Sequence, residues 1–220
     1  MPRRKARKRQ AQGWLGEEMF LHGESWIKRA VDVAGAATGL IVLAPALAIA
    51  AILITLDSPG PVFYTGLRAG KRGRPFRCYK LRTMIVNADE QKAGLRRRNE
   101  RSGPIFKLAC DPRITRVGVW LRRYSVDEIP QLWNVLRGEM SLVGPRPHPL
   151  DDHAEYEPHH LRRLEVTPGV TGLWQVTARK DPSFERGLAL DLEYIQHHSL
   201  SGDVRILVKT VGAVLGGGGS

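Results

Sequence analysis

Cysteine is scarce in this sequence. Cys78 and Cys110 are the only thiols among 220 residues, and they form no spaced motif, which excludes a disulfide scaffold. The counts of 23 Gly and 14 Pro are ordinary, which excludes collagen-like and low-complexity chains. Two isolated thiols are typical of a reducing, cytosolic compartment. The 42% of hydrophobic residues suffice for one compact domain with a core.

Several common functional motifs are also missing. There is no G-x-G-x-x-G, no G-x-S-x-G and no zinc-ligand spacing. The run Gly66–Arg72 resembles a P-loop only superficially, because its glycine spacing is short and no Ser or Thr follows Lys71. His159–His160 and His197–His198 are adjacent pairs, and neighbours on a helix do not face one site. We interpret them as surface histidines rather than metal ligands.

Charge is absent from Val33 to Leu56, and the excess of positive charge surrounds that stretch. Residues 1–29 sum to +5 and residues 57–82 to +6, out of a total of +12. As a straight helix the 24 uncharged residues would be roughly 36 Å long, enough to cross a bilayer core of about 30 Å. The sequence therefore predicts a membrane helix with Lys and Arg at both ends.

Three features favour a re-entrant helix over a plain crossing. Pro45 lies at the centre, where it removes a backbone hydrogen bond and bends a helix. Both flanks are positive, as cytoplasmic flanks are. Each half has about 12 residues, a length typical of re-entrant segments. We expect the helix to enter the cytoplasmic leaflet, bend at Ala44–Pro45 and return, with Lys28 and Arg29 on anionic headgroups.

Three alternatives stay open for this segment. A kinked helix that crosses the membrane once has the same composition. A signal peptide is the second, since Ala46, Ala48 and Ala50 offer small-residue cleavage sites, but the following basic stretch opposes translocation. A buried core helix is the third, although 24 uncharged residues are long for one.

The remaining chain divides into a few segments. Residues 1–24 indicate a flexible basic tail, 25–60 the membrane helix with its break, 61–215 a cytosolic catalytic domain and 216–220 an artificial Gly/Ser linker. Propensity and spacing predict a hairpin at Val62–Thr65 and Phe76–Leu81, helices at 86–101, 117–124 and 129–136, an extended loop at Pro145–Pro149 and a turn at Pro168–Gly169. Apolar spacing predicts a further helix at Asp203–Leu215, whose face we assign to the core rather than the membrane.

An acidic pair, Asp127 and Glu128, follows two arginines. Ser125-x-x-Glu128 is a capping box, so helix capping is one interpretation. The same geometry suits chemistry: a carboxylate at a helix start near Arg122 and Arg123 stays ionised as a nucleophile or metal ligand. Exposed N–H groups and arginines would hold a phosphate beside it.

The run SVDEIPQLWNVLRGEMSLVGPRP at 125–147 resembles the signature of the bacterial sugar transferases, the monotopic phosphoglycosyl transferases. Supporting matches are YKLRTM at 79–84, DPRIT at 111–115 and PGVTGLWQV at 168–176, and the resemblance covers about residues 25–215. The family carries a re-entrant helix broken at Ser-Pro, where this chain has Ala44–Pro45. It implies an α+β, mainly helical fold with amphipathic interfacial helices and a small β-hairpin or sheet around a cytosolic active site.

The resemblance also implies a reaction and its residues. A UDP-sugar gives sugar-1-phosphate to undecaprenyl (polyprenol) phosphate, through Asp127 as nucleophile and with Glu128 helping to hold Mg²⁺ as the second metal ligand beside Asp127. The positions that match family residues near the phosphates are Lys80, Arg122, Arg146, Arg179 and Gln175. The expected place is the bacterial inner (cytoplasmic) membrane, with the catalytic domain facing the cytosol.

Finer points follow less directly. Gly103–Lys107 and the Gly-Leu-Trp-Gln-Val run resemble exopolysaccharide-initiating members, which favours UDP-glucose or UDP-galactose. A homodimer is left open. A nucleic-acid-binding module is the competing class, but the basic runs lack interleaved aromatics and a recognition helix, so no nucleic acid is expected. A non-catalytic membrane scaffold would leave the Asp-Glu and Pro-Arg-Pro runs unexplained.

Overall fold

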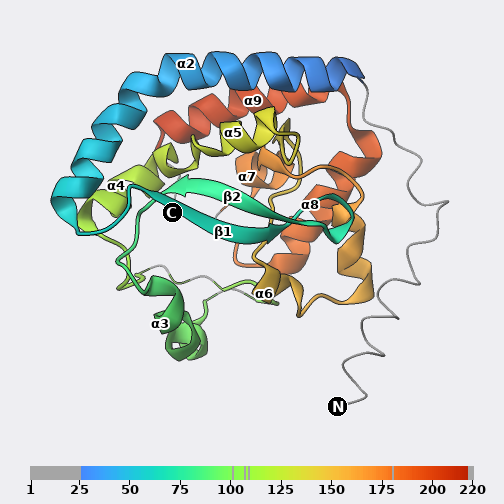
Figure 1. Cartoon of the computed structure of the whole chain (residues 1–220). Coiled ribbons are helices and arrows are strands. Elements are labelled where there is room, and N and C mark those ends of the chain that lie inside the picture. The colour runs from blue at the N-terminus through green and yellow to red at the C-terminus, as the bar shows by residue number, and fades with distance from the viewer. Residues whose placement is uncertain (1–25, 101, 107, 109, 180, 218–220) are drawn as a thin grey trace.

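Helices make up most of the described chain, and one long helix arches over the rest. The computed structural model describes residues 26–217 except Arg101, Lys107, Ala109 and Lys180. The predicted tail and residues 218–220 of the predicted linker lie outside the described residues. In Figure 1, α2 (Trp26–Asp57) curves over a body of shorter helices and two small sheets. The predicted mainly helical class is confirmed.

The two sheets have two strands each. β1 (Phe63–Ala69) and β2 (Pro75–Leu81) pair antiparallel around the short turn η2 (Lys71–Gly73), which confirms the predicted hairpin. β3 (Ser141–Val143) and β4 (Gly169–Thr171) pair parallel. The predicted turn at Pro168–Gly169 is wrong, because the amide of Ser141 donates to the Pro168 carbonyl at 2.8 Å and the chain continues directly into β4.

The predicted helices at 86–101, 117–124, 129–136 and 203–215 are confirmed with shifted ends, and further short helices join them. In chain order the structure contains α3 (Ala88–Leu95), η3 (Arg96–Arg98), α4 (Arg116–Arg123), η4 (Val126–Glu128), α5 (Gln131–Leu136), α6 (Leu150–His153), η5 (Pro158–Leu164), α7 (Leu173–Thr177), α8 (Phe184–His197) and α9 (Leu200–Leu215).

α2 is continuous, with Pro45 inside it, and its ribbon bends midway (Figure 1). Among the described residues it is the one helix long and apolar enough to cross a membrane. Only 11% of its most apolar window is buried, which argues against the core-helix alternative. An unsatisfied carbonyl opposite a proline accounts for such a bend.

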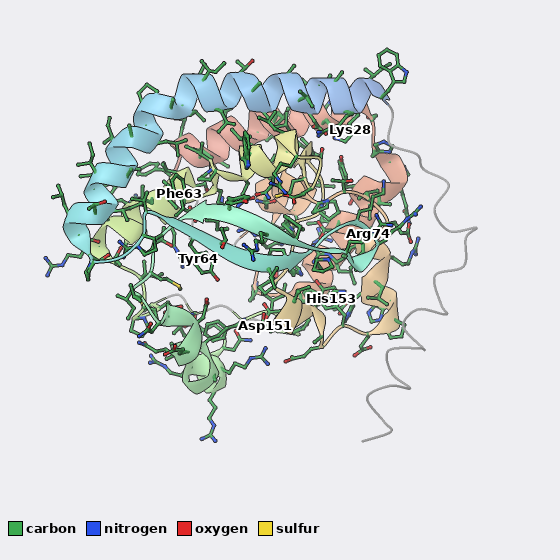
Figure 2. The ribbon with its side chains drawn as sticks, in the orientation of Figure 1. Lys28, Phe63, Tyr64, Arg74, Asp151 and His153 are labelled. Atoms are coloured by element: carbon green, nitrogen blue, oxygen red, sulfur yellow. The ribbon has the colours of Figure 1, made fainter. Side chains whose placement is uncertain are left out.

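The first turns of α2 bind the protein body. Lys28, near the start of α2 (Figure 2), is 8% exposed, and its Nζ lies 2.7 Å from Asp203 Oδ2 on α9 and 3.3 Å from the Val143 carbonyl. Arg29 donates to the carbonyls of Val135 and Leu136 at the end of α5. The expectation that Lys28 binds a lipid headgroup is therefore wrong. The guanidinium of Arg29 binds the last carbonyls of α5.

The last turn of α2 binds the same body. The Asp57 carboxylate accepts from the Val117 amide in the first turn of α4 at 3.0 Å. Arg82, 6% exposed after β2, donates to five carbonyl oxygens between Ile54 and Pro61. One guanidinium thus binds most of the carbonyls in the connection from α2 to β1. These bonds fix the position at which the hairpin starts.

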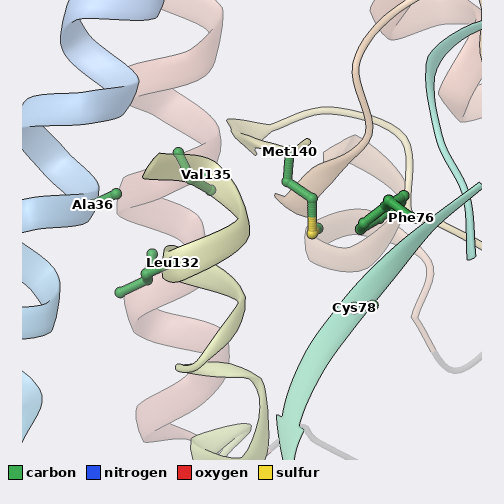
Figure 3. Packing of buried hydrophobic residues seen from close by; sticks show 6 residues of the cluster. All are labelled: Ala36, Phe76, Cys78, Leu132, Val135 and Met140. Carbon is green, nitrogen blue, oxygen red and sulfur yellow. The ribbon is translucent and has the colours of Figure 1, made fainter. Parts of the chain in front are cut away.

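A buried cluster joins α2, the hairpin and α5. Its members are small or apolar and come from distant segments: Ala36, Phe76, Cys78, Leu132, Val135 and Met140 (Figure 3). Both cysteines are free, as predicted, and Cys78 is buried. Asn134, fully buried, binds β2 directly: its Oδ1 accepts from the Tyr79 amide at 3.0 Å and its Nδ2 donates to the Arg77 carbonyl at 2.6 Å. These contacts set the distance from β2 to the segment before α5.

Most of the apolar face of α9 is not in the core, contrary to our assignment, and of that face only Leu207 packs against a core cluster. Val204, Val208, Val211 and Leu215 are 57–75% exposed, whereas Ile206 is buried. Apolar periodicity shows that a helix has one apolar face, but it does not show what that face packs against. That depends on how the helix lies on the rest of the protein. Gly216, assigned to the linker, is the residue at which α9 ends.

Candidate active site

Asp127 and Glu128 lie in η4, a single turn between α4 and α5. Ser125 precedes it with φ +54°, a conformation that side chains other than glycine rarely adopt, and its hydroxyl caps no backbone amide. The Glu128 side chain hydrogen-bonds to cations instead of the Ser125 amide. The capping-box interpretation is therefore wrong, because contacts with distant basic residues replace the local ones.

Glu128 is enclosed by two cations. Its Oε1 lies 2.8 Å from Lys80 Nζ on β2, and its Oε2 accepts from Arg146 Nη1 at 3.0 Å while Arg146 Nη2 also reaches Oε1. Only 7% of Glu128 is exposed. Burial alone would raise the pKa of Glu128, but Arg146 and Lys80 lower it well below its usual value. Glu128 is thus a permanent carboxylate that orients both cations.

Asp127 shares Lys80 with Glu128 but is held much more loosely. It is 6% exposed, its nearest cation is Lys80 Nζ at 3.8 Å, and its carboxylate accepts no hydrogen bond from the described residues. Burial raises the pKa of Asp127, and the Glu128 carboxylate adds to that rise against the opposing effect of Lys80. The shift is opposite to the one that helix capping predicts. An oxygen without hydrogen bonds and poorly solvated is a stronger nucleophile or metal ligand.

Arg122 and Arg179 lie within electrostatic reach of Asp127 and Glu128. Arg122 Nε donates to Thr83 Oγ1 at 2.9 Å, and both terminal nitrogens of Arg179 lie 3.2 Å from Ser125 Oγ. Neither guanidinium has a carboxylate within 4.0 Å in the described part of the chain. Burial lowers the pKa of both arginines, with Arg146 adding to the effect at Arg179.

Four cations therefore surround two carboxylates. The structure brings together Lys80, Arg122, Arg146 and Arg179 with Asp127 and Glu128, the grouping that the family resemblance implies. The resulting excess of two positive charges in a poorly hydrated site favours an anionic ligand such as a diphosphate. An excess of this kind is costly unless a ligand balances it.

Gln175 is the predicted site residue that this cluster does not include. It is buried on α7, and its Nε2 donates to the Val170 carbonyl at 3.2 Å. Its Oε1 has no partner among the described residues, and none of its hydrogen bonds there reaches the cluster. Sequence reasoning missed Thr83, which binds Arg122, and Ser125, which binds Arg179, although both lie inside the quoted motifs.

A divalent cation fits the carboxylates of this site. Mg²⁺ takes hard oxygen ligands from one or two carboxylates together with phosphates and water. Neither oxygen of Asp127 accepts a hydrogen bond from the described residues, and there Glu128 Oε2 accepts from Arg146 Nη1 alone, which leaves it a lone pair. Asp127 and Glu128, the two residues expected to hold Mg²⁺, thus each offer an oxygen that could bind a divalent cation.

A second group of metal-ligating atoms lies away from this site. His159, His160 and Glu185 place one ligand atom each within 4.8 Å of one another, so the two adjacent histidines do approach one point, contrary to our expectation. His160 Nδ1 accepts from the Glu157 amide at 3.0 Å. The neutral ring must then carry its proton on Nε2, which donates to Glu185, so His160 offers no lone pair to a metal.

Comparison with known proteins agrees with the geometry. Residues 23–217 match the family described as bacterial sugar transferase. Among curated relatives, the galactosyl transferase CpsE of Streptococcus agalactiae is 41% identical over 194 residues, 88% of this chain and 43% of that protein. The exopolysaccharide production protein ExoY of Rhizobium meliloti is 41% identical over 191 residues, 85% of this chain and 84% of that protein.

A third relative carries a substrate pair in its name. The UDP-glucose:undecaprenyl-phosphate glucose-1-phosphate transferase of Caulobacter vibrioides is 40% identical over 196 residues, 86% of this chain and 69% of that protein. The chain spans less than half the length of some relatives, such as CpsE, and most of the length of others. With a family match over nearly all the described residues and an Asp-Glu pair among four cations, the chain belongs to the bacterial sugar transferase family.

Proposed function

We propose that this protein transfers a sugar-1-phosphate from a UDP-sugar to undecaprenyl phosphate or a related polyprenol phosphate. One observation carries the proposal: Asp127 is a buried carboxylate that accepts no hydrogen bond within the described part of the chain, beside cations whose charge exceeds that of the acids. The names of the relatives, which include galactosyl and glucose-1-phosphate transferases, support a hexose donor and place such proteins in exopolysaccharide production.

The reaction takes two displacements at one phosphorus. In the first, an Asp127 oxygen forms a bond to the β-phosphorus of the donor, and the bond from that phosphorus to the bridging oxygen breaks, releasing UMP. In the second, a phosphate oxygen of the polyprenol attacks the same phosphorus, and the Asp127–phosphorus bond breaks. The products are the carboxylate and a polyprenol diphosphate sugar. Phosphoryl transfer needs positioning and charge stabilisation, which this cluster supplies.

Each residue has a role in these steps. Glu128 holds Lys80 and Arg146 in place, so that both cations face the phosphates without neutralising the nucleophile. Arg122 and Arg179 supply the unbalanced charge that binds the diphosphate. We assign Mg²⁺ to Asp127 and Glu128 Oε2; when bound, it supplies neutralisation of charge on the pyrophosphate oxygens.

The decisive assay measures nucleotide release. Purified protein in detergent with Mg²⁺ is incubated with a panel of UDP-hexoses, with and without polyprenol phosphate. We expect continuous UMP release only when both substrates are present, with UDP-glucose or UDP-galactose preferred. Absence of UMP from every donor, with lipid present and the protein folded, would refute the function.

Removal of a phosphate-binding arginine has a defined effect. We expect Arg122→Gln to lower kcat/KM for the sugar nucleotide by about 10- to 100-fold, since a charge-assisted hydrogen bond contributes about 1.5–3 kcal/mol. The matched control is Arg123→Gln, the next residue on α4, which stacks over Trp120 and Tyr124. Equal losses in both variants, measured by initial rates, would contradict the role of Arg122.

We also propose that α2 enters the bilayer and returns on the same side. Its first turn binds Asp203, and near its end Asp57 accepts from the Val117 amide and the Ile54 carbonyl accepts from Arg82, so both ends of α2 contact one domain. A helix that crossed the bilayer core would separate its ends by about 30 Å of hydrocarbon. Its outward side carries exposed Ile41, Ile49 and Leu56, and the exposed side of α9 would lie at the interface.

Cysteine labelling tests this topology. In a Cys110→Ser background, Arg3→Cys and Lys71→Cys are each labelled in intact and permeabilised cells with an impermeant maleimide. We expect both positions to be protected in intact cells and labelled after permeabilisation. Labelling of one position from outside and the other only from inside would show a crossing helix. The cytosolic orientation at the inner membrane is tested by the same comparison.

A further inference from the structure

The loop that carries Arg146 has few donors of its own. Residues 144–149 read Gly-Pro-Arg-Pro-His-Pro, and prolines have no N–H to give to a neighbouring carbonyl. The backbone is attached by the Gly169 amide, which donates to the Pro145 carbonyl at 2.9 Å, and by the Ala69 amide, which donates to the His148 carbonyl at 3.1 Å. The carbonyl of Arg146 itself lies between these two attachments.

A buried guanidinium binds that carbonyl. Arg163 on η5 is 4% exposed, and its Nη2 donates to the Arg146 carbonyl at 2.9 Å and to Asp191 Oδ2 on α8. Its Nη1 donates to the Tyr156 hydroxyl at 2.6 Å and lies 3.0 Å from His148 Nε2. Arg163 therefore contacts the loop at both Arg146 and His148, the two residues that alternate with its prolines.

The charge of Arg163 is balanced away from the active site. Asp191 is 4% exposed and is the carboxylate paired with Arg163 in the described chain. The side chain of Arg146 points the other way, to Glu128. The Arg146 backbone and side chain thus connect a buried ion pair behind the loop with the carboxylate beside the nucleophile.

We infer that Arg163 and Asp191 are positioning residues: the pair holds the Arg146 carbonyl so that the Arg146 guanidinium stays bidentate on Glu128. The catalytic part of this inference rests on the proposed function. Loss of the hold leaves the loop free to shift, and a shift of about 1 Å at a phosphate-orienting group is costly to the rate of transfer. Donor binding, which also uses Arg122 and Arg179, is affected less than turnover.

The test replaces Arg163 without removing its charge. Arg163→Lys keeps an ion-pair partner for Asp191, but one ammonium cannot reach Asp191, the Arg146 carbonyl and Tyr156 in the same geometry. We expect kcat to fall about 10- to 30-fold with KM for the donor changed less than about 3-fold. The matched control is Arg162→Lys, the neighbouring exposed arginine that pairs with Glu165. Should Arg163→Lys not fold, Tyr156→Phe removes one partner of Arg163 more gently, with a smaller fall in kcat expected.

A double-mutant cycle separates positioning from general structural damage. In an Arg146→Gln background the contact with Glu128 is already lost, so we expect Arg163→Lys to lower kcat less than about 2-fold further. Equal fold-losses of kcat in both backgrounds would overturn the inference. Equal fold-losses of kcat caused by Tyr156→Phe in the wild-type and Arg146→Gln backgrounds would likewise overturn it.

Hydrogen exchange gives a readout that does not depend on turnover. We expect Arg163→Lys to speed exchange of the Ala69 and Gly169 amides, which are bonded to the loop, while Arg162→Lys leaves them unchanged. If the wild-type protein has no transferase activity but Arg163→Lys still speeds exchange, the proposed function is refuted. The structural part of the inference, that Arg163 holds the Arg146 loop, would then stand. Unchanged exchange at both amides would overturn the inference even in an active enzyme.

Discussion

The Asp127→Asn variant should lose sugar-phosphate transfer by about 10⁴-fold or more while keeping its fold. The amide keeps the shape of the carboxylate but has no charged oxygen to attack phosphorus, and loss of a nucleophile has effects of this size. Asp127 accepts no hydrogen bond in the described chain, so its replacement breaks no hydrogen-bond network. The measurement is UMP release, with the thermal midpoint in detergent compared with wild type.

A covalent adduct provides the complementary result. When the wild-type protein is given UDP-sugar without polyprenol phosphate, we expect a mass increase of one phosphosugar, located on the peptide with Asp127. The Asp127→Asn variant should show no adduct. The control Asp151→Asn removes an exposed carboxylate paired with Lys92 and should transfer normally. Wild-type turnover in Asp127→Asn would exclude this residue as the nucleophile.

Arg82→Ala should destabilise the protein more than other substitutions on the hairpin. Five carbonyl oxygens and the Ser58 hydroxyl share this guanidinium, and alanine would leave carbonyls of the α2 connection without donors. We expect a loss of about 3–5 kcal/mol in the free energy of unfolding. At this chain length that corresponds to a fall of about 6–20 °C in the thermal midpoint.

Two controls sharpen the Arg82 experiment. Arg77→Ala changes an exposed arginine on β2, the strand that precedes Arg82, and should shift the midpoint by no more than about 2 °C. Arg82→Lys keeps the charge but offers three donors from one point, so its stability should lie between those of wild type and Arg82→Ala. An Arg82→Ala midpoint equal to that of Arg77→Ala would show that the carbonyl contacts contribute little.

Local sequence patterns predicted the elements and the active-site segment. The hairpin, the helix after it and the long uncharged helix with Pro45 all follow from propensity, turn residues and apolar length. The Asp-Glu pair was found as an acidic pair among arginines, and the family resemblance supplied its cationic partners. Those features depend on residues close together in the chain.

Predictions failed where distant residues decide. Ser125 and Glu128 have the pattern of a capping box, but Glu128 binds Lys80 and Arg146, 48 and 18 residues away. Lys28 has the pattern of a headgroup contact, but its partner Asp203 lies 175 residues away. In each case a buried charge gains more from an opposite charge than from a local backbone group or water.

By itself, the sequence determined that a hairpin, a long uncharged helix and several further helices form, where the charges lie, and which two acids stand near arginines. Only the tertiary structure decided that Glu128 pairs with Lys80 and Arg146, while Asp127 accepts no hydrogen bond from the described residues. It also decided that α9 turns its valines outward and that both ends of α2 bind one body. The physical reason is range: propensity and periodicity act over a few residues, whereas burial and ion pairing depend on which distant segments meet.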